Sequence, residues 1–209
     1  AFVNWGLYQC GLDTARIAIG DNLLRKPCAT ELMRLNKSFI VKRSAKGPRE
    51  MAKTFSELSS YIADSLQEGH NIWIAQKEGR AKDGDDCTDP AILKMFHMAG
   101  KQKKLGFVEY MQQLNIVPVA ISYEYDPGDE AKARELYETS TNGSYQKSEF
   151  EDIESIVAGI IGYKGRVHVN VGQPLTDGFS TPEELAAVID QAIHAQYRLF
   201  ASNLLAAGV

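Results

Sequence analysis

Three cationic residues and a glutamate follow a short apolar segment, and such a cationic loop is suited to binding a phosphate. Ile72-Trp73-Ile74-Ala75 has the β-branched and aromatic character of a buried strand. The strand cannot continue through the turn expected after it, and the charged residues there are Lys77, Glu78, Arg80 and Lys82. Cations and backbone amides freed by Gly79 are groups that hold phosphates in proteins. A solvated turn with charged residues is the simpler alternative, and this stretch alone does not exclude it.

Two other expected strands end in residues that could join the same site. The strand Phe39–Val41 is closed by Lys42 and Arg43, and Asp21 lies in the turn after the strand Ala15–Ile19. In an open α/β sheet, ligands bind outside the carboxyl ends of parallel strands. At such an edge, Asp21 would lie on the same side of the sheet as the loop that carries Glu78 to Lys82, and it is a weaker candidate for the site.

The elements that must position these residues alternate along the chain. Short apolar segments predict strands at 15–19, 39–41, 72–75, 116–121 and 166–171. Helical spacing and start signals predict helices at 1–12, 27–35, 48–68, from 90 past 98, at 105–114, around 131–137, at 150–161 and from 182 to about 205. Together they predict an α/β protein with a mostly parallel or mixed sheet flanked by helices, with all 209 residues in a single domain.

Several of these expectations depend on particular residues. The helix at 48–68 has one apolar stripe, which consists of Met51, Phe55, Leu58, Ile62 and Leu66. Thr181-Pro182-Glu183-Glu184 has the pattern of a capping box with proline at the first helical position. Pro118 argues against a fully paired central strand at that point.

The net charge of −4 conceals two segments of opposite sign. Residues 26–53 contain eight lysines and arginines against two acids, and residues 124–154 contain ten acids against three bases. A basic segment can face an anionic lipid surface, a nucleic acid or a phosphorylated small molecule, or it can simply be solvated. It is poor in aromatic residues, so we expect no nucleic-acid partner.

The composition excludes several other classes of protein. No run of apolar residues is long enough for a membrane span, and the start of the chain has no signal-peptide pattern. Cys10, Cys28 and Cys87 have neither metal-site nor disulfide-framework spacing, which indicates reduced thiols in a cytoplasmic protein. No glycine-rich phosphate loop or dinucleotide fingerprint is present, which disfavours a nucleotide or phosphotransfer enzyme.

Four segments in order resemble the glycerolipid acyltransferase family, which includes glycerol-3-phosphate and lysophosphatidate acyltransferases. They are the strand from Lys37 to Arg43, the Glu78-Gly79 turn with its basic residues, the strand Val117-Pro118-Val119-Ala120-Ile121, and Val167 to Leu175 with its Gly-x-Pro-Leu ending. The resemblance covers the chain from about Ile19 to Leu175.

The resemblance implies transfer of a fatty acyl group to a hydroxyl of a glycerol phosphate or lysophospholipid. The donor would be acyl-coenzyme A or acyl-carrier protein, acting as a co-substrate, and no other cofactor is implied. Arg43 would bind the phosphate, Glu78 and Gly79 would belong to the substrate-binding loop, and Arg80 or Lys82 would be its basic partner. A planar guanidinium suits a phosphate dianion better than an ammonium does. The expected location is cytoplasmic, with peripheral contact at the inner face of an anionic membrane.

The chain departs from the family pattern at its catalytic pair. The family uses His-x-x-x-x-Asp, in which the histidine is a general base and the aspartate orients it. None of His70, His97, His168 and His194 is followed by an aspartate at that spacing. Two smaller departures are Lys37 where the family has glycine, and Gln76 to Ala81 where it has Phe-Pro-Glu-Gly-Thr-Arg. The chain begins at Ala1, and we expect the catalytic pair to lie in a preceding segment; the alternative is a non-catalytic lipid- or phosphate-binding relative.

Overall fold

The computed structural model describes the whole chain except residues 1, 22–26, 43–46, 78–81, 149 and 209. Its strands are β1 (Arg16–Gly20), β2 (Ser38–Val41), β3 (Ile72–Trp73), β4 (Val119–Tyr123) and β5 (Val167–Val171). Its helices are α1 (Phe2–Gln9), α2 (Pro27–Leu35), α3 (Pro48–Gln67), α4 (Pro90–Gln102), α5 (Phe107–Leu114), α6 (Asp129–Asn142), α7 (Glu151–Ile161), α8 (Pro182–Gln196) and α9 (Ala201–Ala206).

Prolines begin four of the helices. Pro27, Pro48, Pro90 and Pro182 each occupy the first position, where the missing N–H has no helical partner to lose. The Asp89 side chain caps α4 by accepting a hydrogen bond from the Ala91 N–H at 2.8 Å. These local signals explain why the helix starts could be predicted so closely.

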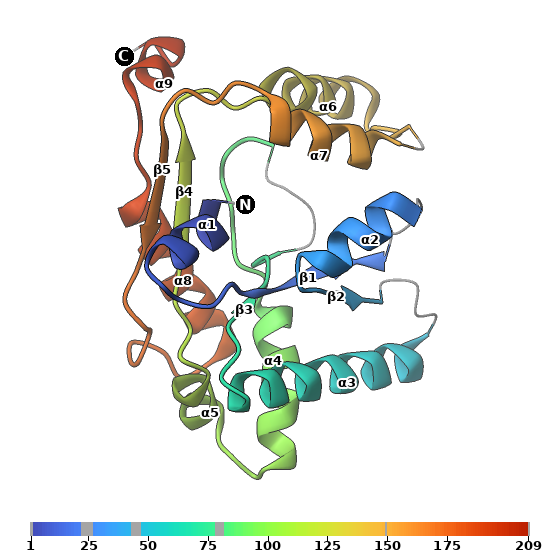
Figure 1. Cartoon of the computed structure of the whole chain (residues 1–209), viewed down its shortest axis with the longest axis vertical. Helices are drawn as coiled ribbons and strands as arrows, with labels where there is room; N and C mark the ends of the chain where they lie inside the picture. The colour runs from blue at the N-terminus through green and yellow to red at the C-terminus, as the bar shows by residue number, and fades with distance from the viewer. Residues whose placement is uncertain (1, 22–26, 43–46, 78–81, 149, 209) are drawn as a thin grey trace.

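The strands form two separate small sheets in the part of the chain that the structure describes. One is parallel, with the order β2-β1-β3, and the other is the antiparallel pair β4-β5 (Figure 1). The fold is thus a single α/β domain, as predicted, but parallel and antiparallel pairing are divided between two sheets. Strand β3 consists of Ile72 and Trp73 alone, and both pair with β1. Strand β4 pairs with β5 and does not extend the parallel sheet.

The antiparallel pair begins after Pro118, as the sequence suggests. Pro118 lacks an N–H, but its carbonyl accepts a hydrogen bond from the Gly172 N–H at 2.9 Å. The Ile116 carbonyl likewise accepts from the Leu175 N–H at 2.9 Å. Pairing therefore extends past the strand ends and holds the segment after β5 against the one before β4.

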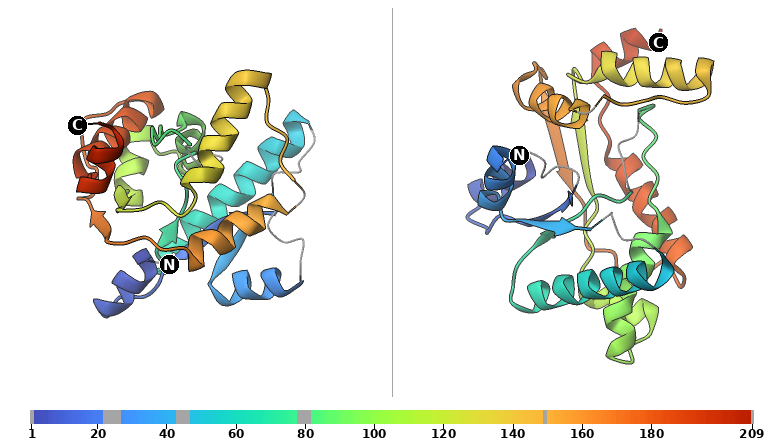
Figure 2. Two further views of the ribbon diagram at one scale, coloured as in Figure 1. Left: turned by 90° about the horizontal axis from the view of Figure 1, so that it is seen from above. Right: turned by 90° about the vertical axis from the view of Figure 1, so that its right-hand side faces the viewer.

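The core lies between helices α3, α4, α5 and α8. Helix α4 contacts the other three, and α8 also contacts β4. One buried cluster includes Leu93, Met111 and Leu185, and a second consists of Leu58, Ile62 and Met95. The buried Ser59 hydroxyl joins α3 to α4 by donating to the Phe96 carbonyl and accepting from the Ala99 N–H. Helices α6 and α7 lie at the opposite end of the molecule from α3 and α5 (Figures 1 and 2).

The expectation of one helix from 182 to about 205 is wrong. Helix α8 ends at Gln196, and Tyr197 has extended backbone. The chain is held in this shape because the Arg198 N–H donates to the hydroxyl of Ser122, which is fully buried on β4. Phe200 is also buried, with the guanidinium groups of Arg166 and Arg198 over its ring, before α9 starts at Ala201.

Candidate functional site

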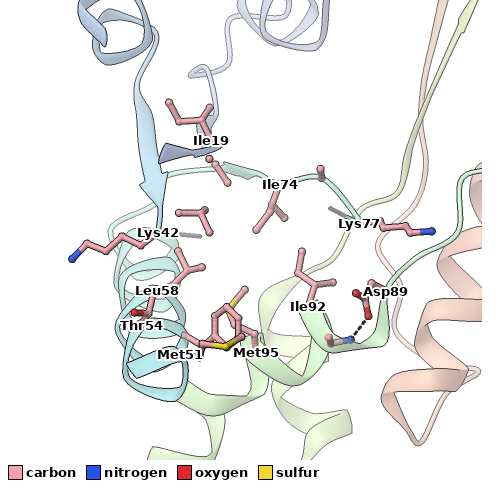
Figure 3. Close-up of a pocket in the computed structure, with 16 residues that line it drawn as sticks. Ile19, Lys42, Met51, Thr54, Leu58, Ile74, Lys77, Asp89, Ile92 and Met95 are labelled. Atoms are coloured by element: carbon pink, nitrogen blue, oxygen red, sulfur yellow. Dashed lines mark hydrogen bonds between the residues drawn. The ribbon is translucent and has the colours of Figure 1, made fainter. Parts of the chain in front are cut away.

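A cavity of about 300 Å³ lies where the parallel strands end. Its walls come from the carboxyl ends of β1 and β2, the residues after β3, and the facing sides of α3 and α4 (Figure 3). The lining residues on the strand side are Ala18, Ile19, Gly20, Val41, Lys42, Ile74, Ala75 and Lys77, and those on the helix side are Met51, Thr54, Phe55, Leu58, Asp89, Ala91, Ile92 and Met95. The cavity thus occupies the edge at which α/β sheets bind ligands.

Part of the apolar stripe of α3 forms a wall of the cavity, and part of it packs in the core. Leu58 and Ile62 are buried in the core, whereas Met51 and Phe55 are 44% and 37% exposed and line the cavity. The stripe noted in the sequence is therefore divided between the core and the cavity. Large apolar side chains that face an open cavity can contact an apolar ligand.

The charged groups of the cavity lie at its border. Figure 3 shows Lys42 and Lys77 on opposite sides of the cavity, with their side chains directed away from it. The Asp89 carboxylate also lies in the lining, where it caps α4. An amphiphile fits this distribution if its apolar part lies inside and its anionic group reaches the lysines.

Most of the predicted phosphate site lies outside the described residues. Arg43, Glu78, Gly79 and Arg80 are among the positions that the structure does not describe. In the chain, Arg43 follows Lys42 and Glu78 follows Lys77, and both lysines line the cavity. Asp21 follows Gly20, another residue of the lining. The described neighbours of the predicted residues are therefore brought together around one cavity.

Lys82 is among the predicted site residues that the structure describes, and it lies against α6. Its ammonium forms an ion pair with Glu135 at 3.2 Å, and both side chains are largely covered, at 19% and 22% exposed. Lys82 is absent from the described lining of the cavity. This ion pair neutralises its charge and joins the loop after β3 to the acidic segment between β4 and β5.

The residues after Lys82 are fixed on α8 by Thr88. The Thr88 N–H and hydroxyl both donate to the Asp190 carboxylate, at 2.8 and 2.6 Å. The Asp89 N–H then donates to the Gln76 carbonyl at 2.9 Å. These bonds hold the start of α4 beside Lys77 and so define one side of the cavity.

The histidines show no arrangement directed at the cavity. His97 lies within hydrogen-bond distance of the Leu105 carbonyl and packs edge-on against Phe107, and His168 lies opposite Ser122 in the β4-β5 pair. His194 lies 3.8 Å from Asp85, a pairing that sequence spacing could not reveal, but both side chains are more than half exposed. None of these histidines belongs to the described lining.

The described part of the chain shows no grouped metal ligands, and Cys87 lacks the environment of a reactive thiol. Coulombic repulsion from Asp85, whose oxygen lies 3.9 Å from the sulfur, raises the pKa of the Cys87 thiol and disfavours the thiolate. Within the described ranges, no three His, Cys, Asp or Glu side chains are grouped as metal ligands.

Comparisons with known proteins add no family assignment. No protein-family model matches the chain, and no curated protein matches it significantly. Among the described helices, none combines the length and apolar character that a membrane span requires.

Proposed function

We propose that this protein transfers a fatty acyl group from acyl-coenzyme A or acyl-carrier protein to a hydroxyl of a glycerol phosphate or lysophospholipid. The observation that best supports this proposal is the apolar cavity at the carboxyl edge of the parallel sheet, bordered by Lys42 and Lys77. The acyl group would lie against Met51, Phe55 and Ile92. The acceptor phosphate would lie at the border, where the sequence places Arg43 directly after Lys42. The resemblance to glycerolipid acyltransferases supports the same assignment.

The reaction would proceed by direct attack without a covalent enzyme intermediate. The acceptor oxygen bonds to the thioester carbonyl carbon, the carbon–sulfur bond breaks, and the hydroxyl proton ends on the released thiol. The family resemblance assigns the proton transfer to a His-x-x-x-x-Asp pair, which these 209 residues do not contain. We therefore assign the residues described here to binding and orientation of the substrates.

A non-catalytic lipid- or phosphate-binding protein is the second candidate. The missing His-x-x-x-x-Asp pair favours it, because the same cavity could bind an amphiphile without turning it over. The two candidates differ in whether thiol is released.

The deciding assay mixes the protein with a fatty acyl thioester, with and without glycerol 3-phosphate, and follows the free thiol. Acyl transfer predicts thiol release that depends on glycerol 3-phosphate and yields an acylated glycerol phosphate. Binding without release would favour the second candidate, and absence of both binding and release would contradict both.

Replacing Arg43 tests the acceptor side of the proposal. In a catalytically active preparation, Arg43→Ala should raise the KM for the phosphorylated acceptor about tenfold or more, because a hydrogen bond to a charged group is lost. Steady-state kinetics with varied acceptor would measure this. Arg134→Ala is the matched comparison, since Arg134 pairs with Glu130 on α6 and is not part of the described cavity lining, and it should leave that KM nearly unchanged. Unchanged acceptor kinetics in Arg43→Ala would show that the assigned role is wrong.

A further inference from the structure

Met95 closes the end of the cavity that α3 and α4 form. It belongs to the lining and is only 7% exposed, and Leu58 lies beside it in the lining at 9%. Figure 3 shows Met95 with Met51 and Leu58 on the helix side of the cavity, across from Ile19 on the strand side. The deep end is therefore apolar, whereas the lysines lie at the border.

Behind Met95 the cavity gives way to core. Met95, Leu58 and Ile62 form one buried cluster, against which Leu66, Ile72 and Phe96 pack. Met95 thus has one side toward the cavity and another toward the core. A ligand chain that enters between α3 and α4 would meet Met95 before the packed interior.

We propose that Met95 sets the length of the acyl chain that the cavity accepts. The inference rests on the proposed function and adds a specificity-determining residue to it. Each methylene that leaves water for the cavity should tighten binding about fourfold. That gain should stop when the chain end reaches Met95, because the close-packed core behind it yields little space.

The size of the residue at position 95 should then move the limit in both directions. Met95→Ala removes most of the side chain and should admit longer chains. Met95→Phe places a rigid ring at the same point and should lower the longest chain length that the cavity accepts. Two opposite shifts from one position would not result from general loosening of the fold.

The experiment is calorimetric titration with a series of n-alkyl phosphates, kept below their critical micelle concentrations. In the parent protein, the dissociation constant should fall about fourfold per methylene and then level off at one chain length. The levelling point should move to longer chains in Met95→Ala and to shorter chains in Met95→Phe. Circular dichroism would first show that each variant is folded, and either variant alone still tests the direction of its shift.

Met111→Ala is the control. Met111 is fully buried in the other core cluster and is not part of the cavity lining, so this variant should keep the parent levelling point. A levelling point that stays unchanged in both Met95 variants would overturn the role of Met95 while leaving the binding proposal intact. Absence of alkyl phosphate binding at every chain length in the parent protein would overturn both.

Discussion

At the residue scale, Gly100 shows how closely α4 and α5 approach each other. A Cβ atom at this position would lie 2.5 Å from Cγ of the Tyr110 ring, nearer than packed atoms can come. Tyr110 is itself buried at 3% exposure and is not free to move aside. Gly100 is thus required by packing, although glycine weakens the helix that contains it.

We expect Gly100→Ala to lower the free energy of unfolding by about 1–3 kcal/mol, because the overpacked contact outweighs the better helix propensity of alanine. Urea denaturation would measure the change. Gly159→Ala is the matched control, since a Cβ there meets nothing within 4 Å on helix α7. The control should gain up to about 1 kcal/mol; an equal gain in Gly100→Ala would contradict the packing argument.

The cavity could be predicted from sequence only in part, and its residues show why. That ligand-binding residues gather at the carboxyl ends of the strands follows from general rules of α/β folds, and Lys42 and Lys77 lie at such ends. Apolar periodicity placed Met51 and Phe55 on the apolar face of a helix but could not reveal that they face a cavity. Periodicity identifies the apolar face of a helix, whereas the distance to the opposing element depends on tertiary packing.

At the element scale, α8 has a complete capping box. The Thr181 hydroxyl accepts from the Glu184 N–H, and the Glu184 carboxylate accepts from the Thr181 N–H, both at 3.2 Å. The carboxylate also accepts from the Ser180 N–H at 2.6 Å. These bonds satisfy N–H groups that have no partner within the helix.

We expect Thr181→Ala to lower the free energy of unfolding by about 1 kcal/mol, since one side of the box is lost. The neighbouring Ser180→Ala keeps the backbone N–H that reaches Glu184 and should change stability by less than about 0.5 kcal/mol. Urea titrations of both variants in parallel would measure the difference. Equal effects would mean that the hydroxyl of Thr181 contributes nothing through the cap.

Helices whose ends carry such signals could be predicted almost to the residue. Helix α2 spans Pro27–Leu35 as expected, and α3 starts at Pro48. The break between α8 and α9 could not be foreseen, because it depends on a hydrogen bond from Arg198 to Ser122, which is far away in the sequence. Local chemistry determines where a helix starts, and tertiary contacts can end one where the local pattern would continue.

At the scale of the whole molecule, the division into two sheets also could not be read from the sequence. An alternating order of strands and helices predicts parallel pairing, and β1, β2 and β3 obey that rule. Strand β5 instead pairs antiparallel with β4 after a long helical excursion. The pairing of strands depends on contacts between residues far apart in the sequence, and no local pattern encodes it.

Ion pairs that involve carboxylates link distant elements and make stability depend on pH. Bidentate hydrogen bonding to Arg166 lowers the pKa of Glu124, and Lys94 and Lys37 likewise lower the pKa values of Glu183 and Asp13. A folded-state pKa below the unfolded value means that the carboxylate stabilises the fold above its ordinary pKa. This contribution is lost as the pH falls through the folded-state pKa.

We expect the urea midpoint to fall as the pH drops below about 4, the ordinary range of carboxyl pKa values. Glu124→Gln should be less stable than the parent protein at neutral pH and should lose less of its remaining stability on acidification. Urea titrations at neutral and acidic pH would measure both slopes. Parallel pH dependences in the two proteins would contradict a stabilising role for the Glu124–Arg166 pair.

The β4-β5 pair has a consequence for how this chain can change in length. The Glu124 N–H donates to the Arg166 carbonyl at 2.9 Å, and the Tyr125 N–H donates to the Lys164 carbonyl at 3.1 Å. Residues 126–163, with α6 and α7, therefore leave and return at hydrogen-bonded neighbours, and neither helix contributes to the described cavity lining. Evolution or an engineer can therefore lengthen, shorten or replace parts of this segment while the entry and exit points keep their spacing and Glu135 remains to pair with Lys82.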